Sequence, residues 1–250
     1  MDLNRIYALV NMELKKIIRE PAYFFMMLLF PAVLSLLFGL LFGTTPSAIS
    51  GKSMFDIMAP GIFAYACIFI TMIVAQTFCD DREFGLLKRI TTTPTTSSEF
   101  ILSHIISNTL LSLLQVVVVT IIIFLIGFRP EGGIIGFFFA FLFITLLSIC
   151  SVGFGLITAT IAKNSGSATA LSFIFILPQM FFGTFIPLNE TTTLIAIFFP
   201  SYYATESIKM IFNGSMITNP IIWIYFLMLG LMSIGIITIG ILLFEKYGKN

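Results

Sequence analysis

Charged side chains are scarce in this sequence of 250 residues. Lys and Arg together number 13, Asp and Glu number 12, and charged residues make up 10% of the chain. Ordinary soluble domains contain about 25% charged residues, because a surface in contact with water has to be solvated. The shortage excludes a soluble globular fold, and a net charge of +1 gives no reason to expect nucleic acid as a partner.

The residues of common catalytic and metal sites are also few. The chain has one histidine and three cysteines, Cys67, Cys79 and Cys150, which lie in or beside apolar stretches. A single histidine excludes paired-histidine metal motifs, and such cysteines are typical of small buried side chains. No Gly-x-Ser-x-Gly motif occurs, and the Gly-Lys-Ser at 51–53 has Pro46 where a phosphate-binding loop needs its first glycine. We therefore expect no metal, no cofactor and no catalytic residue in this chain.

Long apolar runs are abundant instead. A membrane-spanning helix needs about 20 apolar residues. Six runs meet this length, and they are residues 23–43, 57–79, 100–128, 134–162, 167–186 and 220–244. The runs lack the alternation of polar and apolar residues that barrel strands require. The sequence therefore predicts one all-α domain, residues 1–250, with six transmembrane helices.

The basic residues indicate an orientation. Six spans put both termini on the same side of the membrane, and all but three of the 13 Lys and Arg residues then fall on that side; the exceptions are Lys52, Arg129 and Lys209. The side rich in Lys and Arg is the cytoplasmic one. We therefore expect a multi-pass protein of the plasma membrane with cytoplasmic termini.

Residues 1–22 carry an amphipathic pattern. Apolar side chains recur at helical spacing from Leu3 to Ile18, and most charged side chains lie between them. Such a helix is typical of the membrane interface, in contact with lipid, and Pro21 then turns the chain into the first span. A helix packed on cytoplasmic loops is the alternative.

Residues 187–218 are apolar but interrupted. Pro200, Glu206 and Lys209 break the stretch, and neither half is long enough to cross a bilayer. We expect a re-entrant or interfacial helical hairpin on the exterior side, followed by the last span at 219–244. Glu206 and Lys209 are three residues apart, and we predict that they form an ion pair; separate solvation is the alternative.

A few polar residues interrupt the spans. They are His104, Asn108, Ser112 and Gln115 on one face of the third span, with Gln76 and Gln179 in the second and fifth. They either form hydrogen bonds between packed helices or line one wall of a substrate path. No Asp, Glu, Lys or Arg lies within the six apolar cores, which leaves His104 as an isolated titratable group. Ion-coupled carriers keep ionisable groups at membrane depth, so this mechanism is not favoured.

The most polar stretch connects the second and third spans. Residues 80–100 read DDREFGLLKRITTTPTTSSEF, with acids first and bases later, an order that suits the helix dipole. Phe84, Leu87 and Ile90 would form an apolar face before Pro94 ends the helix. A short helix of this kind is suited to a groove on a soluble partner. The alternative is a segment that only solvates a turn.

Three segments together resemble the membrane subunit of type 2 ABC exporters, over nearly the whole chain. Residues 13–43 resemble the family's entry, an interfacial helix followed by the first span, and residues 80–98 resemble its coupling loop. Residues 181–211 resemble its exterior hairpin, except that Phe199 stands where Asn commonly precedes the proline.

This resemblance implies a dimer of permease subunits that encloses the translocation path, bound to two ATP-binding subunits. ATP and Mg²⁺ would belong to those partners, and this chain would not be an enzyme. The resemblance also implies which residues contact the ATP-binding subunit; they are Arg82, Glu83, Phe84, Gly85, Leu87, Lys88, Arg89 and Pro94, with Glu13 and Arg19 from the N-terminal helix.

The sequence does not identify the cargo, and composition only favours a class of molecule. The spans share most of 29 phenylalanines, which suits a lipophilic or amphipathic molecule such as a drug, an antibiotic or a lipid. Export of polysaccharide or glycolipid is an alternative, and a membrane-embedded enzyme or an ion-coupled carrier is a rival of another class.

Overall fold

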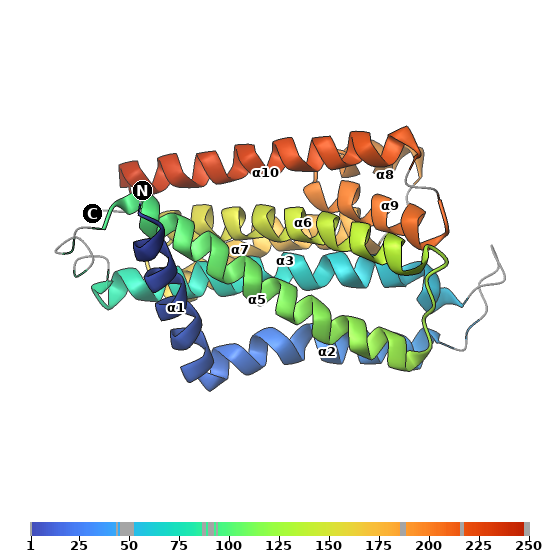
Figure 1. The fold of residues 1–250 in the computed structure, drawn as a ribbon, viewed down its shortest axis with the longest axis horizontal. Coiled ribbons are helices and arrows are strands. Elements are labelled where there is room, and N and C mark those ends of the chain that lie inside the picture. The colour runs from blue at the N-terminus through green and yellow to red at the C-terminus, as the bar shows by residue number, and fades with distance from the viewer. Residues whose placement is uncertain are drawn as a thin grey trace.

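Six membrane-length helices form the body of the protein. A computed structural model describes residues 2–43, 45, 53–86, 89, 93, 95–185, 189–215 and 218–247 (Figure 1). The helices long and apolar enough to span a membrane are α2 (Pro21–Phe42), α3 (Met54–Glu83), α5 (Ser97–Ile126), α6 (Gly133–Ile161), α7 (Ser165–Met180) with its π-helical continuation η1 (Phe181–Phe185), and α10 (Pro220–Tyr247). The shorter helices are α1 (Leu3–Arg19), α8 (Glu190–Ala196) and α9 (Pro200–Phe212). The predicted all-α fold with six spans is confirmed.

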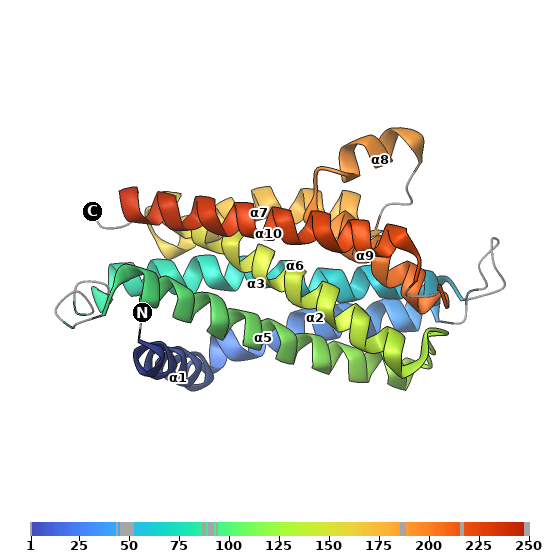
Figure 2. The same ribbon diagram turned by 45° about the horizontal axis from the view of Figure 1, so that its top comes forward.

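Helix α3 lies at the centre of the bundle. It packs against α5, α6 and α7, and nearly all of its residues from Phe55 to Cys79 are buried (Figures 1 and 2). The helices α2 and α10 lie at the rim, and large apolar side chains such as Leu37, Leu41 and Leu231 are exposed on their outer faces. Apolar surface of this extent is stable only against lipid or another apolar surface. The fold is therefore that of a membrane protein.

Local hydrogen bonds explain where α3 begins and ends. The Ser53 side chain accepts from the backbone N–H of Asp56, whose carboxylate accepts from Ser53 in return, so this capping box starts the helix. At the other end the Phe84 N–H donates to Asp80, and Gly85 adopts a φ of +71°, which a glycine tolerates best. The helix extends beyond the apolar run at 57–79, because the helical ladder continues to Glu83.

The chain ends share one end of the bundle. The start of α1, the end of α10, the end of α3 and the start of α5 all lie at that end, whereas α8 and α9 lie at the opposite one (Figures 1 and 2). This arrangement is what an even number of spans requires.

Helix α1 runs crosswise to the spans (Figure 1), the orientation of a helix that lies along an interface. It packs on α5 and α2. Ile6 and Ile17 are buried in this contact, whereas Leu3, Tyr7 and Ile18 are exposed. The apolar residues of the amphipathic pattern therefore divide into two groups, one buried against the other helices and one exposed on the surface of the protein.

The segment before the last span forms α8 and α9; residues 186–188 and 216–217 of the predicted hairpin lie outside the described residues. Helix α9 is mostly buried beside α3, α6 and α10. The Lys209 ammonium donates to Glu206 Oε1 over 3.2 Å, and the predicted ion pair is present in this structure.

Candidate functional site

The predicted coupling residues lie at the end of α3. Phe84 is 77% exposed, directly after the helix, and Arg89 is also exposed. Leu87, Lys88 and Pro94 lie outside the described residues. The apolar docking face expected from the sequence is therefore represented in the structure by Phe84 alone.

Arg82 and Glu83 bind other parts of the chain. The Arg82 guanidinium donates to the carbonyl oxygens of Ala162 and Thr160, at the end of α6. Glu83 Oε1 accepts from the backbone N–H of Ser165 over 3.1 Å, at the start of α7. Both residues belong to the last turn of α3 and not to a separate loop. Their contacts tie α3 to the α6–α7 turn, a structural role that the sequence did not indicate.

An Arg82→Ala variant is expected to lower thermal stability. The change leaves two carbonyl groups at the end of α6 without a charged donor. Hydrogen bonds to a charged group contribute about 1.5–3 kcal/mol to stability when they are well shielded. Because Arg82 is half-buried, we expect the free energy of unfolding to fall by about 1–2 kcal/mol. The measurement is the melting midpoint of the purified protein in detergent. A Lys163→Ala variant is the control, because it removes an exposed charge from the same turn. Equal midpoints for the two variants would contradict the assignment.

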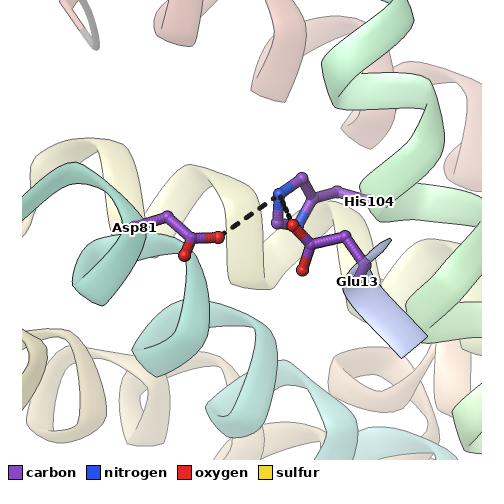
Figure 3. Close-up of side chains that lie close together, drawn as sticks. All are labelled: Glu13, Asp81 and His104. Carbon is purple, nitrogen blue, oxygen red and sulfur yellow. Dashed lines mark ion pairs between the residues drawn. The ribbon is translucent and has the colours of Figure 1, made fainter. Parts of the chain in front are cut away.

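A buried cluster of ionisable groups lies where α1, α3 and α5 meet. Glu13 comes from α1, Asp81 from α3 and His104 from α5, and all three are at most 3% exposed. His104 Nε2 lies 3.3 Å from Glu13 Oε1 and 3.6 Å from Asp81 Oδ2, and Figure 3 shows both carboxylates directed at this ring nitrogen. We refer to these three residues as the junction triad.

The junction triad corrects two predictions. His104 is not isolated, because two carboxylates face it. The side chain of Glu13 is fully buried in this structure and cannot contact a partner protein directly, so that prediction is wrong. Arg19, predicted to serve the same contact, is exposed.

Two further bonds strengthen this junction. The Lys16 ammonium donates to Asp81 Oδ1, and Tyr23 at the start of α2 donates to Asp80 Oδ2 over 2.8 Å. Burial by itself raises the pKa of Glu13, but the facing His104 and Lys16 outweigh that effect and hold the pKa below its ordinary value. The bonds connect α1 and α2 to the end of the central helix, so a displacement of α1 acts on α3.

The polar row of α5 is entirely buried inside the subunit. His104, Asn108, Ser112 and Gln115 have no exposed surface, and Ser112 shares a hydrogen bond of 2.9 Å with Ser148 of α6. A path between two permease subunits would require these side chains at the surface. The burial therefore favours the packing alternative over the path alternative.

The glutamines of the other spans differ from each other. The Gln179 side chain is buried and donates to its own helix at Phe175, whereas Gln76 is half-buried. The backbone carbonyl of Gln179 also accepts a hydrogen bond from Ser201 of α9. Gln179 thus belongs to the packing of α7 on the hairpin.

Fold and junction together define a polytopic helical membrane protein whose central span ends at the exposed Phe84, at the same end of the bundle as the start of α1 and the end of α10. The family model described as "ABC-2 type transporter" matches residues 4–213, and the chain belongs to this family. A protein of Porphyra purpurea named as a transport permease, ycf38, is 28% identical over 222 residues, which are 85% of this chain and 75% of that protein. The chain is accordingly a transport permease of the ABC-2 type, and the family implies an ATP-binding subunit as its partner.

Proposed function

We propose that this chain is the permease subunit of an ATP-driven exporter, in which two copies form the translocation path. The observation that carries the proposal is the continuity of α3. This helix is the most buried span, and it continues without a break to Glu83, beside the exposed Phe84. Movement of an ATP-binding subunit against Phe84 would therefore act directly on the centre of the bundle.

The proposed orientation follows from the position of the termini. ATP is available in the cytoplasm, so the end of the bundle that holds Phe84, the start of α1 and the end of α10 has to be the cytoplasmic end. The excess of Lys and Arg assigned to that side supports the same orientation. We place the protein in the plasma membrane, with α8 and α9 toward the exterior.

A lipophilic or amphipathic cargo suits the surface of the spans. Phenylalanines such as Phe25, Phe30, Phe138 and Phe173 are exposed on the outward faces, together with many Leu and Ile side chains. A path bordered by two such faces offers dispersion contacts and little solvation for a charged polar molecule. A drug, an antibiotic or a lipid-like molecule therefore fits better than an ion.

Reconstitution with the ATP-binding subunit tests this function. Inside-out vesicles that contain both chains are expected to accumulate a lipophilic fluorescent dye when ATP is added. The control contains an ATP-binding subunit that cannot hydrolyse ATP, and we expect accumulation to fall to background.

Two results would contradict the proposed function. One is ATP-independent transport by this chain alone. The other is labelling of a Phe84→Cys variant by a membrane-impermeant maleimide applied outside intact cells, because no cytoplasmic motor could then reach this segment. The native cysteines are all buried, so they contribute little background to the labelling.

A further inference from the structure

We propose that the junction triad, Glu13, Asp81 and His104, binds a divalent transition-metal ion of the Zn²⁺ type. The sequence led us to expect no metal, because a single histidine and scattered carboxylates form no recognisable motif. Metal binding at this place does not depend on the proposed export function, and it is tested separately.

The distances from His104 to the two carboxylates match those between ligands of one ion. Their ligand atoms lie within 4.8 Å of one another, and His104 Nε2 is 3.3 Å and 3.6 Å from the facing oxygens of Glu13 and Asp81. Zinc bonds to nitrogen and oxygen are about 2.0–2.2 Å long, so two ligands at a tetrahedral angle lie about 3.4 Å apart. A hydrogen bond between nitrogen and oxygen is typically shorter, about 2.9–3.0 Å.

The donor atoms also lack hydrogen bonds. Among the described residues, none lies in hydrogen-bonding geometry with either ring nitrogen of His104, either carboxylate oxygen of Glu13, or Asp81 Oδ2. The Lys16 ammonium faces Glu13 Oε2 at 3.9 Å, beyond hydrogen-bond distance. Buried polar atoms nearly always have such a partner. One ion between the three side chains would satisfy His104 Nε2 and one oxygen of each carboxylate together. The side chains come from three helices and converge on the same space (Figure 3).

The donor set selects the kind of metal. Mg²⁺ and Ca²⁺ prefer oxygen ligands alone, whereas an imidazole nitrogen suits Zn²⁺, Cu²⁺, Ni²⁺ and Fe²⁺. Lys16 binds the other oxygen of Asp81, Oδ1, and leaves Oδ2 directed at His104. This bond orients the ligating carboxylate, as polar neighbours of metal ligands commonly do. Direct contact of His104 with the two carboxylates, without an ion, is the alternative, and the experiment below separates the two cases.

A bound ion would join α1 to α3 and α5. The ligands lie on the crosswise helix, on the central span and on its neighbour, so the ion would restrict movement of α1 relative to the spans. On the proposed function, this junction lies beside the end of α3, where ATP-driven movement enters the bundle.

The single histidine makes the site directly measurable. The full chain is purified with an affinity tag that contains no histidine, equilibrated with Zn²⁺ and freed of excess metal. We expect about one Zn²⁺ per chain by mass spectrometry of the metal. Co²⁺ in its place is expected to give the visible absorption of a tetrahedral site without a thiolate charge-transfer band.

Variants identify the ligands. His104→Gln and Glu13→Gln are each expected to weaken Zn²⁺ binding at least tenfold. Glu206→Gln is the matched control, because it neutralises a carboxylate of an ion pair at the other end of the bundle, and it should bind Zn²⁺ as the wild type does. Equal binding by the wild type and His104→Gln would overturn the proposal.

A measurement on the wild type covers the case in which a variant does not fold. Pulsed electron paramagnetic resonance of the Cu²⁺-loaded chain is expected to detect one imidazole nitrogen ligand, which only His104 can supply. Folded wild-type protein that retains no metal would overturn the proposal and leave the direct contacts of His104 with the two carboxylates as the link. Bound metal without an imidazole ligand would also overturn it.

Discussion

A Phe84→Asp variant is expected to lose its ATP-binding partner. Phe84 is 77% exposed at the end of the central helix, so the substitution removes little packing within the chain. An aromatic anchor in an interface commonly contributes about 2 kcal/mol or more, and a carboxylate in the same groove is costly to desolvate. We therefore expect at least tenfold weaker co-purification of the ATP-binding subunit and a matching loss of ATP-driven dye transport.

The matched control for this experiment is Phe198→Asp. Phe198 is 72% exposed between α8 and α9, at the opposite end of the bundle, so the chemical change is the same and only the place differs. This variant should retain its partner. Loss of the partner in both variants would indicate a general defect of insertion, and retention in both would contradict the assignment of the coupling segment.

A Gly183→Ala variant is expected to give a large loss of folded protein. Gly183 lies in η1, against α9, and an added Cβ would stand 1.8 Å from Ser201 Oγ and 2.6 Å from Ser201 Cβ. The hydroxyl could rotate only by giving up its bond to the Gln179 carbonyl, and Cβ cannot move without the backbone. Overpacking of this kind costs about 1–3 kcal/mol. Fluorescence-detected size exclusion and the melting midpoint measure the effect.

Two comparisons make the Gly183 result specific. A Gly230→Ala change in α10 adds a Cβ that meets nothing within 4 Å, and it should be neutral or slightly stabilising. A second change, Ser201→Gly, removes the atoms that the new Cβ would meet and should recover part of the stability of Gly183→Ala. If the double variant melts no higher than the single one, contact with Ser201 is not the cause.

The elements of the fold were predictable because their signals are local. A run of about 20 apolar residues specifies a span wherever its neighbours lie, and all six predicted spans are present. The capping residues that set the start of α3 and α5 lie within four positions of one another, Ser53 with Asp56 and Thr96 with Glu99. The end of α3 lies beyond the apolar run, and the apolar pattern did not indicate that Arg82 and Glu83 bind polar partners on the α6–α7 turn.

The site was predictable only in outline. The position of the coupling segment, between the second and third spans, followed from its charge and from the resemblance. The junction triad did not follow from either. Glu13, Asp81 and His104 are far apart in the sequence, and each alone looks like an ordinary polar residue of its helix. Only the packing of α1 across the end of the bundle brings the three together.

The amino-acid sequence by itself determined that this protein lies in a membrane and which apolar segments form the six membrane-length helices of the described residues. These properties depend on the transfer of local apolar segments from water to lipid, which each segment undergoes independently. The tertiary structure decided that α3 is the central helix, that Arg82 holds the α6–α7 turn, and that Glu13 faces His104 instead of a partner. Those outcomes depend on contacts between distant segments, which exist only after the helices have packed.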